Sequence, residues 1–242
     1  PSLQNGLQIV LEGEVTSRPY LEMTLSLLNK IGVSTSFQEN SIFIQPKKQL
    51  EAPINLIVES DWSSASYYYS IIALSPLQTS IHLKYYQMNS LQGDSALAEI
   101  YQHFGVQTVF EDNGLTITKT LQAKVSYNFN LNNCPDIAQT IAVTALALGA
   151  KCDLFGLHTL KIKETDRLQA LQNEIEKLGG IIKITDNSLH LEPSFWLGQN
   201  ITIATYNDHR MAMAFAPLAL KVPIQIEDAQ VVSKSYPEFW SD

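Results

Sequence analysis

The stretch RLQALQNEIEKLGGIIKITDNSLHL, residues 167–191, contains the pattern on which the fold depends. Its apolar residues first recur at helical spacing, and two short alternating segments follow, separated by a polar turn with Asn187. This order predicts an amphipathic helix that ends at Gly179, where a left-handed backbone is commonly needed, and then a β-hairpin. The predicted buried stripe of the helix consists of Leu168, Leu171, Ile175 and Leu178.

The same layout occurs twice more along the chain. YLEMTLSLLNKIGVSTSFQENSIFI spans residues 20–44, and ALAEIYQHFGVQTVFEDNGLTI spans residues 96–117. The corresponding glycines, Gly32, Gly105 and Gly179, lie about 73 residues apart, a longer period than that of the common solenoid repeats. The chain therefore contains an internal repeat of a larger supersecondary unit.

A second motif, an Asp followed by a helix rich in small residues, lies between these segments. It begins at Asp136 and Asp208 and, in a looser copy, at Asp61. Small residues permit close packing, and an Asp at the first position is expected to cap the helix N-terminus. Together the two motifs give a βαβαββ unit, which predicts an α/β fold with mixed (α+β) sheets. Complete units are expected at about 54–126 and 127–200, with partial units before and after them.

Composition limits the classes of partner. Of the 242 residues 45 % are hydrophobic and 17 % charged, below the usual charged share of about 25 %, so the chain can fill a sizeable core. The net charge of −8 argues against nucleic acid or an anionic membrane as the main partner. No apolar run approaches the ~20 residues of a membrane span. The segment IQPKKQLEAP, residues 44–53, is the expected linker.

The two cysteines, Cys134 and Cys152, belong to no C-x-x-C pair, so neither a zinc site nor a disulfide framework is expected. We expect buried reduced thiols and a cytoplasmic location. No Gly-rich phosphate loop is present, and the sequence gives no reason to invoke a nucleotide cofactor or a metal. Residue 1 is Pro rather than Met and leads directly into strand-like sequence, so we expect a piece of a longer protein.

Charged residues cluster where apolar helices are predicted to begin. Arg167 in KIKETDRL and Arg210 in NDHRMAM fall in first helical turns, where cations are disfavoured. Either each pairs locally, Arg167 with Glu164 or Asp166, or an anionic ligand lies beside it. Two arginines at the starts of related helices favour a ligand with at least two anionic groups.

Three further positions have simpler alternative readings. Asp136 could act only as an N-cap, which is compatible with a catalytic carboxylate. Lys234, in VVSKSYPEF, could be an ordinary surface lysine, and Ser17, in SRPY, could be a helix cap.

In this order, KETDRL and NDHRMAM resemble the signatures of the 5-enolpyruvylshikimate-3-phosphate synthase family. SRPY, DWSSASYYYS, NSLQGD, PDIAQT and SKSYPEF also follow the family's order, so the resemblance spans essentially all 242 residues. It implies the enolpyruvyl transferase fold, an inside-out α/β barrel of βαβαββ units in two domains with the active site between them. Residues 1–59 would be the incomplete tail of the shikimate-phosphate-side domain. Residues 60–242 would be the second domain, which carries most phosphoenolpyruvate-binding residues.

The resemblance implies transfer of the carboxyvinyl group of phosphoenolpyruvate to the 5-hydroxyl of shikimate 3-phosphate, with release of phosphate. This is a step towards chorismate and the aromatic amino acids, carried out by a monomeric cytoplasmic enzyme without a cofactor. Asp136 and Glu164 would be the proton-transfer pair, and His209 is a possible further site residue. Thr159 stands where the family often has Asn, which puts one shikimate contact in doubt. The implied substrate-binding residues are Ser17, Tyr20, Thr159, Lys163, Arg167, Arg210 and Lys234.

Two alternatives remain at this point. UDP-N-acetylglucosamine enolpyruvyl transferase shares the repeat but lacks the pairing of KETDR with NDHRMAM. The chain could also be a non-catalytic anion-binding module. Because half of the family's cleft is missing from these residues, we expect the isolated chain to show no carboxyvinyl transfer.

Overall fold

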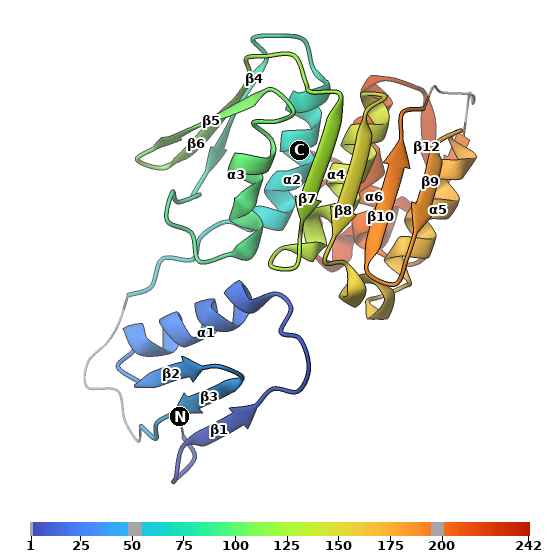
Figure 1. Ribbon diagram of the computed structural model, residues 1–242. Coiled ribbons are helices and arrows are strands. Elements are labelled where there is room, and N and C mark those ends of the chain that lie inside the picture. Colours follow the sequence, from blue (N-terminus) through green and yellow to red (C-terminus); the bar gives the residue numbers. More distant parts are fainter. Residues whose placement is uncertain (1, 48–54, 195–200) are drawn as a thin grey trace.

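The structure is a computed structural model that describes residues 2–47, 55–194 and 201–242. A small N-terminal unit lies beside a larger one, in which several sheets surround packed helices (Figure 1). In the small unit, α1 lies against an antiparallel sheet with the strand order β1-β3-β2. Its elements are β1 (Leu7–Val10), α1 (Arg18–Lys30), β2 (Thr35–Gln38) and β3 (Ser41–Ile44).

The next repeat forms an antiparallel sheet with the strand order β4-β6-β5, beside α2. Its elements are α2 (Trp62–Leu74), β4 (Ser80–Lys84), the 3₁₀ helix η1 (Gly93–Ala96), α3 (Leu97–Ile100), β5 (Val106–Glu111) and β6 (Gly114–Lys119).

The following repeat is a complete βαβαββ unit, as the sequence predicts. Its sheet has the order β7-β8-β10-β9, with β7 parallel to β8 and the other pairs antiparallel. Its elements are β7 (Ser126–Asn130), η2 (Pro135–Ile137), α4 (Ala138–Ala147), β8 (Lys151–Phe155), η3 (His158–Ile162), α5 (Arg167–Lys177), β9 (Ile181–Ile184) and β10 (Ser188–Glu192).

The last part of the chain starts another unit, in which β11 and β12 pair in parallel. Its elements are β11 (Ile201–Ile203), α6 (His209–Phe215), η4 (Ala216–Leu220), β12 (Ile224–Ile226) and η5 (Ala229–Lys234).

The small-residue helices α2, α4 and α6 form the centre of the larger unit, with α4 packed against both others. Equivalent positions of the repeat hydrogen-bond across α2 and α4: Ser66 Oγ lies 3.0 Å from Thr140 Oγ1, and Ser70 Oγ 2.8 Å from Thr144 Oγ1. Since small side chains let helix axes approach closely, this packing brings the N-termini of the helices together. The predicted buried stripe of α5 is confirmed, because its four residues are at most 1 % exposed.

The structure departs from the predicted pattern in two places. No strand forms over residues 55–60, where Ile57 and Val58 are 84 % and 87 % exposed, so the first complete unit lacks its leading strand. The amphipathic segment from residue 96 gives only the short α3, because the chain continues to Phe104 as successive turns with i→i+3 hydrogen bonds. Most of the expected linker 44–53, and the expected boundary at residue 200, lie outside the described residues.

Cys134 and Cys152 are free and buried, in agreement with the prediction of reduced thiols. Across the three described ranges, every helix is too short or too polar to traverse a bilayer.

A substitution at Gly105 tests the prediction that the helix of each repeat needs glycine at its end. Its φ is +78°, and an added Cβ would collide with the carbonyl oxygen of Leu121. Gly105→Ala should lower the free energy of unfolding by more than about 2 kcal/mol, because left-handed strain adds to overpacking. Gly149→Ala is the matched control: its φ is +65°, but the Cβ would meet only Ser194 O at 3.6 Å, so a loss of about 1 kcal/mol is expected. Equal losses in urea unfolding would contradict this account.

Candidate active site

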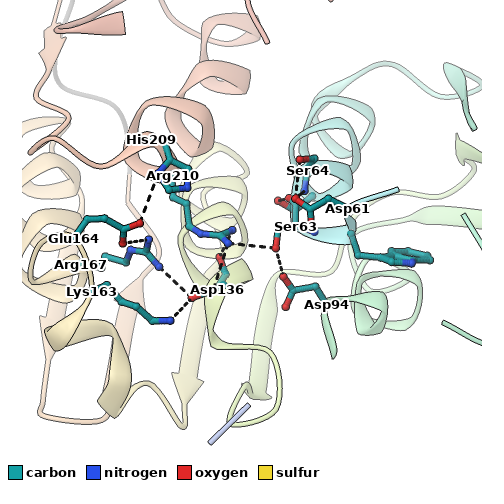
Figure 2. A network of polar contacts seen from close by, with 12 residues as sticks. Asp61, Ser63, Ser64, Asp94, Asp136, Lys163, Glu164, Arg167, His209 and Arg210 are labelled. Atoms are coloured by element: carbon teal, nitrogen blue, oxygen red, sulfur yellow. Dashed lines mark hydrogen bonds and ion pairs between the residues drawn. The ribbon is translucent and has the colours of Figure 1, made fainter. Parts of the chain in front are cut away.

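Arg167 is the first residue of α5, and its side chain is 2 % exposed. Its guanidinium group points back towards the starts of α4 and α6 and contacts three carboxylates. Figure 2 shows the contacts with Asp136 and Glu164. Nε donates to Asp208 Oδ2 at 2.6 Å, Nη1 to Asp136 Oδ1 at 3.0 Å and Nη2 to Glu164 Oε2 at 2.6 Å. The unusual position of Arg167 is therefore explained by carboxylates, only one of which is a sequence neighbour.

Asp208 joins two helices. It is completely buried, caps α6 by accepting the backbone N–H of Arg210 at 2.8 Å, and binds Arg167 with the same carboxylate. Asp166 accepts from the backbone N–H of Gln169 and so caps α5 rather than offsetting Arg167. The Asp208 carboxylate thus fixes the start of α5 against that of α6.

Asp136 does not cap α4, contrary to the prediction from the repeated motif. It lies within η2, and its side chain faces three cations: Lys163 Nζ at 3.2 Å and Arg167 Nη1 at 3.0 Å from Oδ1, and Arg210 Nη2 at 3.3 Å from Oδ2. Burial alone would raise the pKa of Asp136, but Arg210, Lys163 and Arg167 outweigh it and hold the pKa below its ordinary value. Asp136 is therefore ionised at neutral pH.

Arg210 is held less tightly than Arg167. It contacts Asp136 Oδ2 at 3.3 Å, Asp136 O at 3.4 Å and Ser63 Oγ at 3.3 Å, all at the long end of hydrogen-bond range. Its side chain is 15 % exposed. An anion could therefore replace some of these contacts at little cost.

Glu164 is the most exposed of the three carboxylates, whereas the neighbouring His209 is buried. The Glu164 side chain is 37 % exposed, and its Oε1 is 3.8 Å from His209 Nδ1, which makes no hydrogen bond. Burial and the neighbouring Arg210 lower the pKa of His209, so the ring is neutral at pH 7. Glu164, Asp208 and His209 are close enough to hold a metal ion, but both carboxylates already bind the Arg167 cation, which disfavours a second cation there.

The other predicted site residues differ in whether their side chains interact with this network or its neighbours. Lys234 donates to the carbonyl oxygen of Asn207 at 2.7 Å, next to Asp208. Tyr20, at the start of α1, interacts with Asp94 and is close enough to Asp136 for its charge to act on the phenol. In the described part of the chain no hydrogen bond or ion pair links the side chain of Ser17 or Thr159 to the network. Ser17 makes no side-chain capping bond either.

Sequence reasoning did not identify three members of the network. Asp208 was interpretable only as a cap, although it also binds Arg167. Ser63 and Asp94 occur in quoted motifs, but nothing in their spacing distinguishes them from ordinary helix-start residues. Ser63 Oγ donates to Asp94 Oδ2 and lies near Arg210, which only the folded chain reveals.

Arg167→Met should lower the free energy of unfolding by about 3–5 kcal/mol, because it leaves the buried Asp208 carboxylate without its cation. Arg18→Met is the matched control. Arg18 pairs with Glu22 at the surface, where such pairs contribute under about 1 kcal/mol. Urea unfolding at pH 7 measures both variants, and a similar small loss in each would show that the Arg167 network does not stabilise the fold.

Comparison with known proteins identifies the family of the chain. The family model described as EPSP synthase (3-phosphoshikimate 1-carboxyvinyltransferase) matches residues 1–242. A 3-phosphoshikimate 1-carboxyvinyltransferase of Bacteroides fragilis (strain YCH46) is 44 % identical over 250 residues, which cover 100 % of this chain and 59 % of that protein. One from Neisseria meningitidis (strain FAM18) is 35 % identical, covering 99 % and 56 %. The chain thus spans about three fifths of the length of these curated relatives.

Solved structures agree on the fold. An EPSP synthase from Acinetobacter baumannii has a TM-score of 0.76 at 20 % identity, covering 97 % of this chain and 55 % of the other. The enolpyruvyl transferase NikO from Streptomyces tendae has a TM-score of 0.71 at 12 % identity, covering 99 % and 55 %. These likenesses concern the fold alone and confirm the predicted enolpyruvyl transferase architecture. The relatives at 44 % and 35 % identity carry the name 3-phosphoshikimate 1-carboxyvinyltransferase, which does not favour the UDP-N-acetylglucosamine alternative. Because the family model matches the chain over its full length, the chain belongs to the EPSP synthase family.

Proposed function

We propose that the whole protein transfers the carboxyvinyl group of phosphoenolpyruvate to the 5-hydroxyl of shikimate 3-phosphate and releases phosphate. One observation carries the proposal. Two carboxylates from separate segments, Asp136 and Glu164, are held on the guanidinium fork of Arg167, with Arg210 and Lys163 beside them. Membership of the EPSP synthase family supports the same reaction.

The reaction is an addition followed by an elimination. The 5-hydroxyl oxygen attacks C2 of phosphoenolpyruvate and loses its proton while C3 gains one; the tetrahedral adduct then expels phosphate and loses a proton from C3. A base and an acid must therefore serve one reacting centre. Asp136 and Glu164 form this pair. The ionised Asp136 can also hold the hydroxyl groups of shikimate, and the more exposed Glu164 can exchange protons with solvent.

The anionic groups of phosphoenolpyruvate need several cations. Arg210 is available because its present contacts are long, and Lys234 is available because it is exposed. Arg167 can join them when Glu164 takes up a proton, since the neutral acid holds Nη2 less strongly and releases that nitrogen to the substrate. Lys163, Ser17, Tyr20 and Thr159 remain proposed contacts of shikimate 3-phosphate.

We also propose that residues 1–59 and 60–242 belong to different domains. The buried apolar residues of the N-terminal unit, Leu25, Val33 and Ile42, belong to neither hydrophobic cluster of the larger unit, which supports this division. The monomeric state and the cytoplasmic location stay predictions.

Glu164→Gln is the test of the mechanism, in an enzyme of full family length that contains this chain. The amide keeps the size of the side chain but cannot transfer the proton, so kcat for phosphate release should fall by about 10²–10⁴. The circular dichroism spectrum should be unchanged.

Glu176→Gln is the matched control, because Glu176 is exposed on the same helix, away from the network. It should retain wild-type turnover. If Glu164→Gln were as active as this control, Glu164 would have no part in proton transfer.

A further inference from the structure

Asp94 is a buried carboxylate beside the proposed active site that the mechanism above does not use. It lies in η1, with its carboxylate facing Ser63 (Figure 2). The residue is 0 % exposed. Ser63 Oγ, from the first turn of α2, donates to Asp94 Oδ2. The side chain does not cap its own helix, since η1 has no side-chain capping bond. A helix-capping role therefore does not explain it.

The contact with Asp94 decides how Ser63 can meet Arg210. A hydroxyl has one proton, and an ionised carboxylate can only accept. Ser63 therefore donates its hydroxyl hydrogen bond to Asp94 and accepts one from Arg210 Nη2, 3.3 Å away. Asp94 thereby fixes the orientation of a hydroxyl that in turn holds the guanidinium group.

Asp94 also reaches the N-terminal unit. Burial first, and then the charge of Asp94 and a hydrogen bond to it, raise the pKa of Tyr20 well above its ordinary value. Tyr20 lies at the start of α1, and Arg210 at the start of α6. One carboxylate therefore contacts a proposed shikimate-phosphate residue directly and a proposed phosphoenolpyruvate residue through Ser63.

This arrangement opposes stability at neutral pH. Burial raises the pKa of Asp94 to about 6, in spite of the hydrogen bond from Ser63 and the nearby Arg210, so the group is charged at pH 7 in a desolvated place. A neutral side chain of the same size would avoid this cost. The combination of a buried charge and a chain of contacts through Ser63 to Arg210 is typical of a side chain kept for function.

We propose that Asp94 is a positioning residue that, through Ser63, holds Arg210 ready for the anionic group of phosphoenolpyruvate and, through Tyr20, links this arrangement to the shikimate 3-phosphate subsite. The inference rests on the proposed function and deepens it.

The test compares Asp94→Asn, Asp94→Ala, Ser63→Ala and the double variant Asp94→Ala with Ser63→Ala, in an enzyme of full family length that contains this chain. Asp94→Ala and Ser63→Ala should each raise KM for phosphoenolpyruvate about tenfold and change kcat less than threefold, because Arg210 loses its orientation but not its charge. Asp94→Asn, which keeps an acceptor for Ser63 but loses the charge, should raise KM less. Asp153→Asn, a carboxylate change on β8 beside His190, should leave KM unchanged.

The double variant distinguishes a relay, in which Asp94 acts on Arg210 through Ser63, from independent effects of the two substitutions, because only a relay makes their effects non-additive. If Asp94 acts through Ser63, Asp94→Ala in the Ser63→Ala background should change KM for phosphoenolpyruvate less than twofold. Effects that multiply in the double variant would overturn the relay. So would an unchanged KM in both Asp94 variants.

The stability of the folded protein supplies a second readout, because the charge of Asp94 is expected to destabilise the fold at neutral pH while it supports substrate binding. The folded pKa of about 6 lies above the ~3.9 of an unfolded Asp, so the folded protein binds more protons between these values. The stability contributed by Asp94 is full below about pH 4 and lost as the pH rises through 6. The groups facing it are Arg210 on α6, Asp136 on η2, Tyr20 on α1, Ser63 on α2 and the Cys134 thiol.

Asp94→Asn should therefore not lower the thermal unfolding midpoint at pH 7.5, even though it raises KM for phosphoenolpyruvate. A midpoint that fell together with the affinity would indicate a purely structural side chain and overturn the proposal. The proposed function fails separately: a wild-type enzyme that releases no phosphate from the two substrates would refute it, whereas an active wild type with unaffected Asp94 variants would refute only the role of Asp94.

Discussion

The buried guanidinium group of Arg167 is the interaction on which the site depends. Three carboxylates from three segments, Asp136, Glu164 and Asp208, bind its nitrogens, and the Arg167 side chain itself is almost fully buried. A buried cation without partners would cost several kcal/mol, so the three segments must come together for the chain to fold. The assembly that stabilises Arg167 also positions the two carboxylates proposed for proton transfer.

The repeat explains how the segments meet. Small-residue helices α2, α4 and α6 pack side by side, so their first turns lie at one end of the unit, where free N–H groups attract anions. The three equivalent aspartates then differ in use. Asp61 only caps its helix, Asp208 caps and also binds Arg167, and Asp136 has left the capping position to face Lys163, Arg167 and Arg210. The same position of the repeat thus caps a helix in Asp61, caps a helix and binds a cation in Asp208, and only faces cations in Asp136.

The charged groups in this region are arranged so that a ligand can replace some of their contacts, rather than for maximal stability of the unliganded protein. Arg167 is tightly bound, whereas Arg210 is held by contacts of 3.3–3.4 Å that an anionic ligand could replace. Asp94 is charged at neutral pH in a site that disfavours charge. Such groups lower the free energy of unfolding of the unliganded protein. They are expected at a binding site, where the binding energy of the ligand offsets this loss.

The sequence by itself determined the periodic part of the protein. The glycines at helix ends, the buried stripe of α5, the βαβαββ order of the β7–β10 repeat and the clustering of charges at helix starts follow from local patterns, because backbone conformation and side-chain periodicity act over a few residues. The family signatures also named Asp136, Glu164, Arg167 and Arg210. They could not tell which groups pair with which.

Tertiary structure alone decided the pairing. Asp208 meets Arg167 across 41 residues, and Ser63 meets Arg210 across 147, so no local pattern records either contact. Burial separates Asp94 from an ordinary surface acid, and the fold, not the motif, moves Asp136 away from the capping position it was expected to occupy. The physical reason is that hydrogen-bond partners and desolvation depend on which distant segments pack together, and packing is a property of the whole chain.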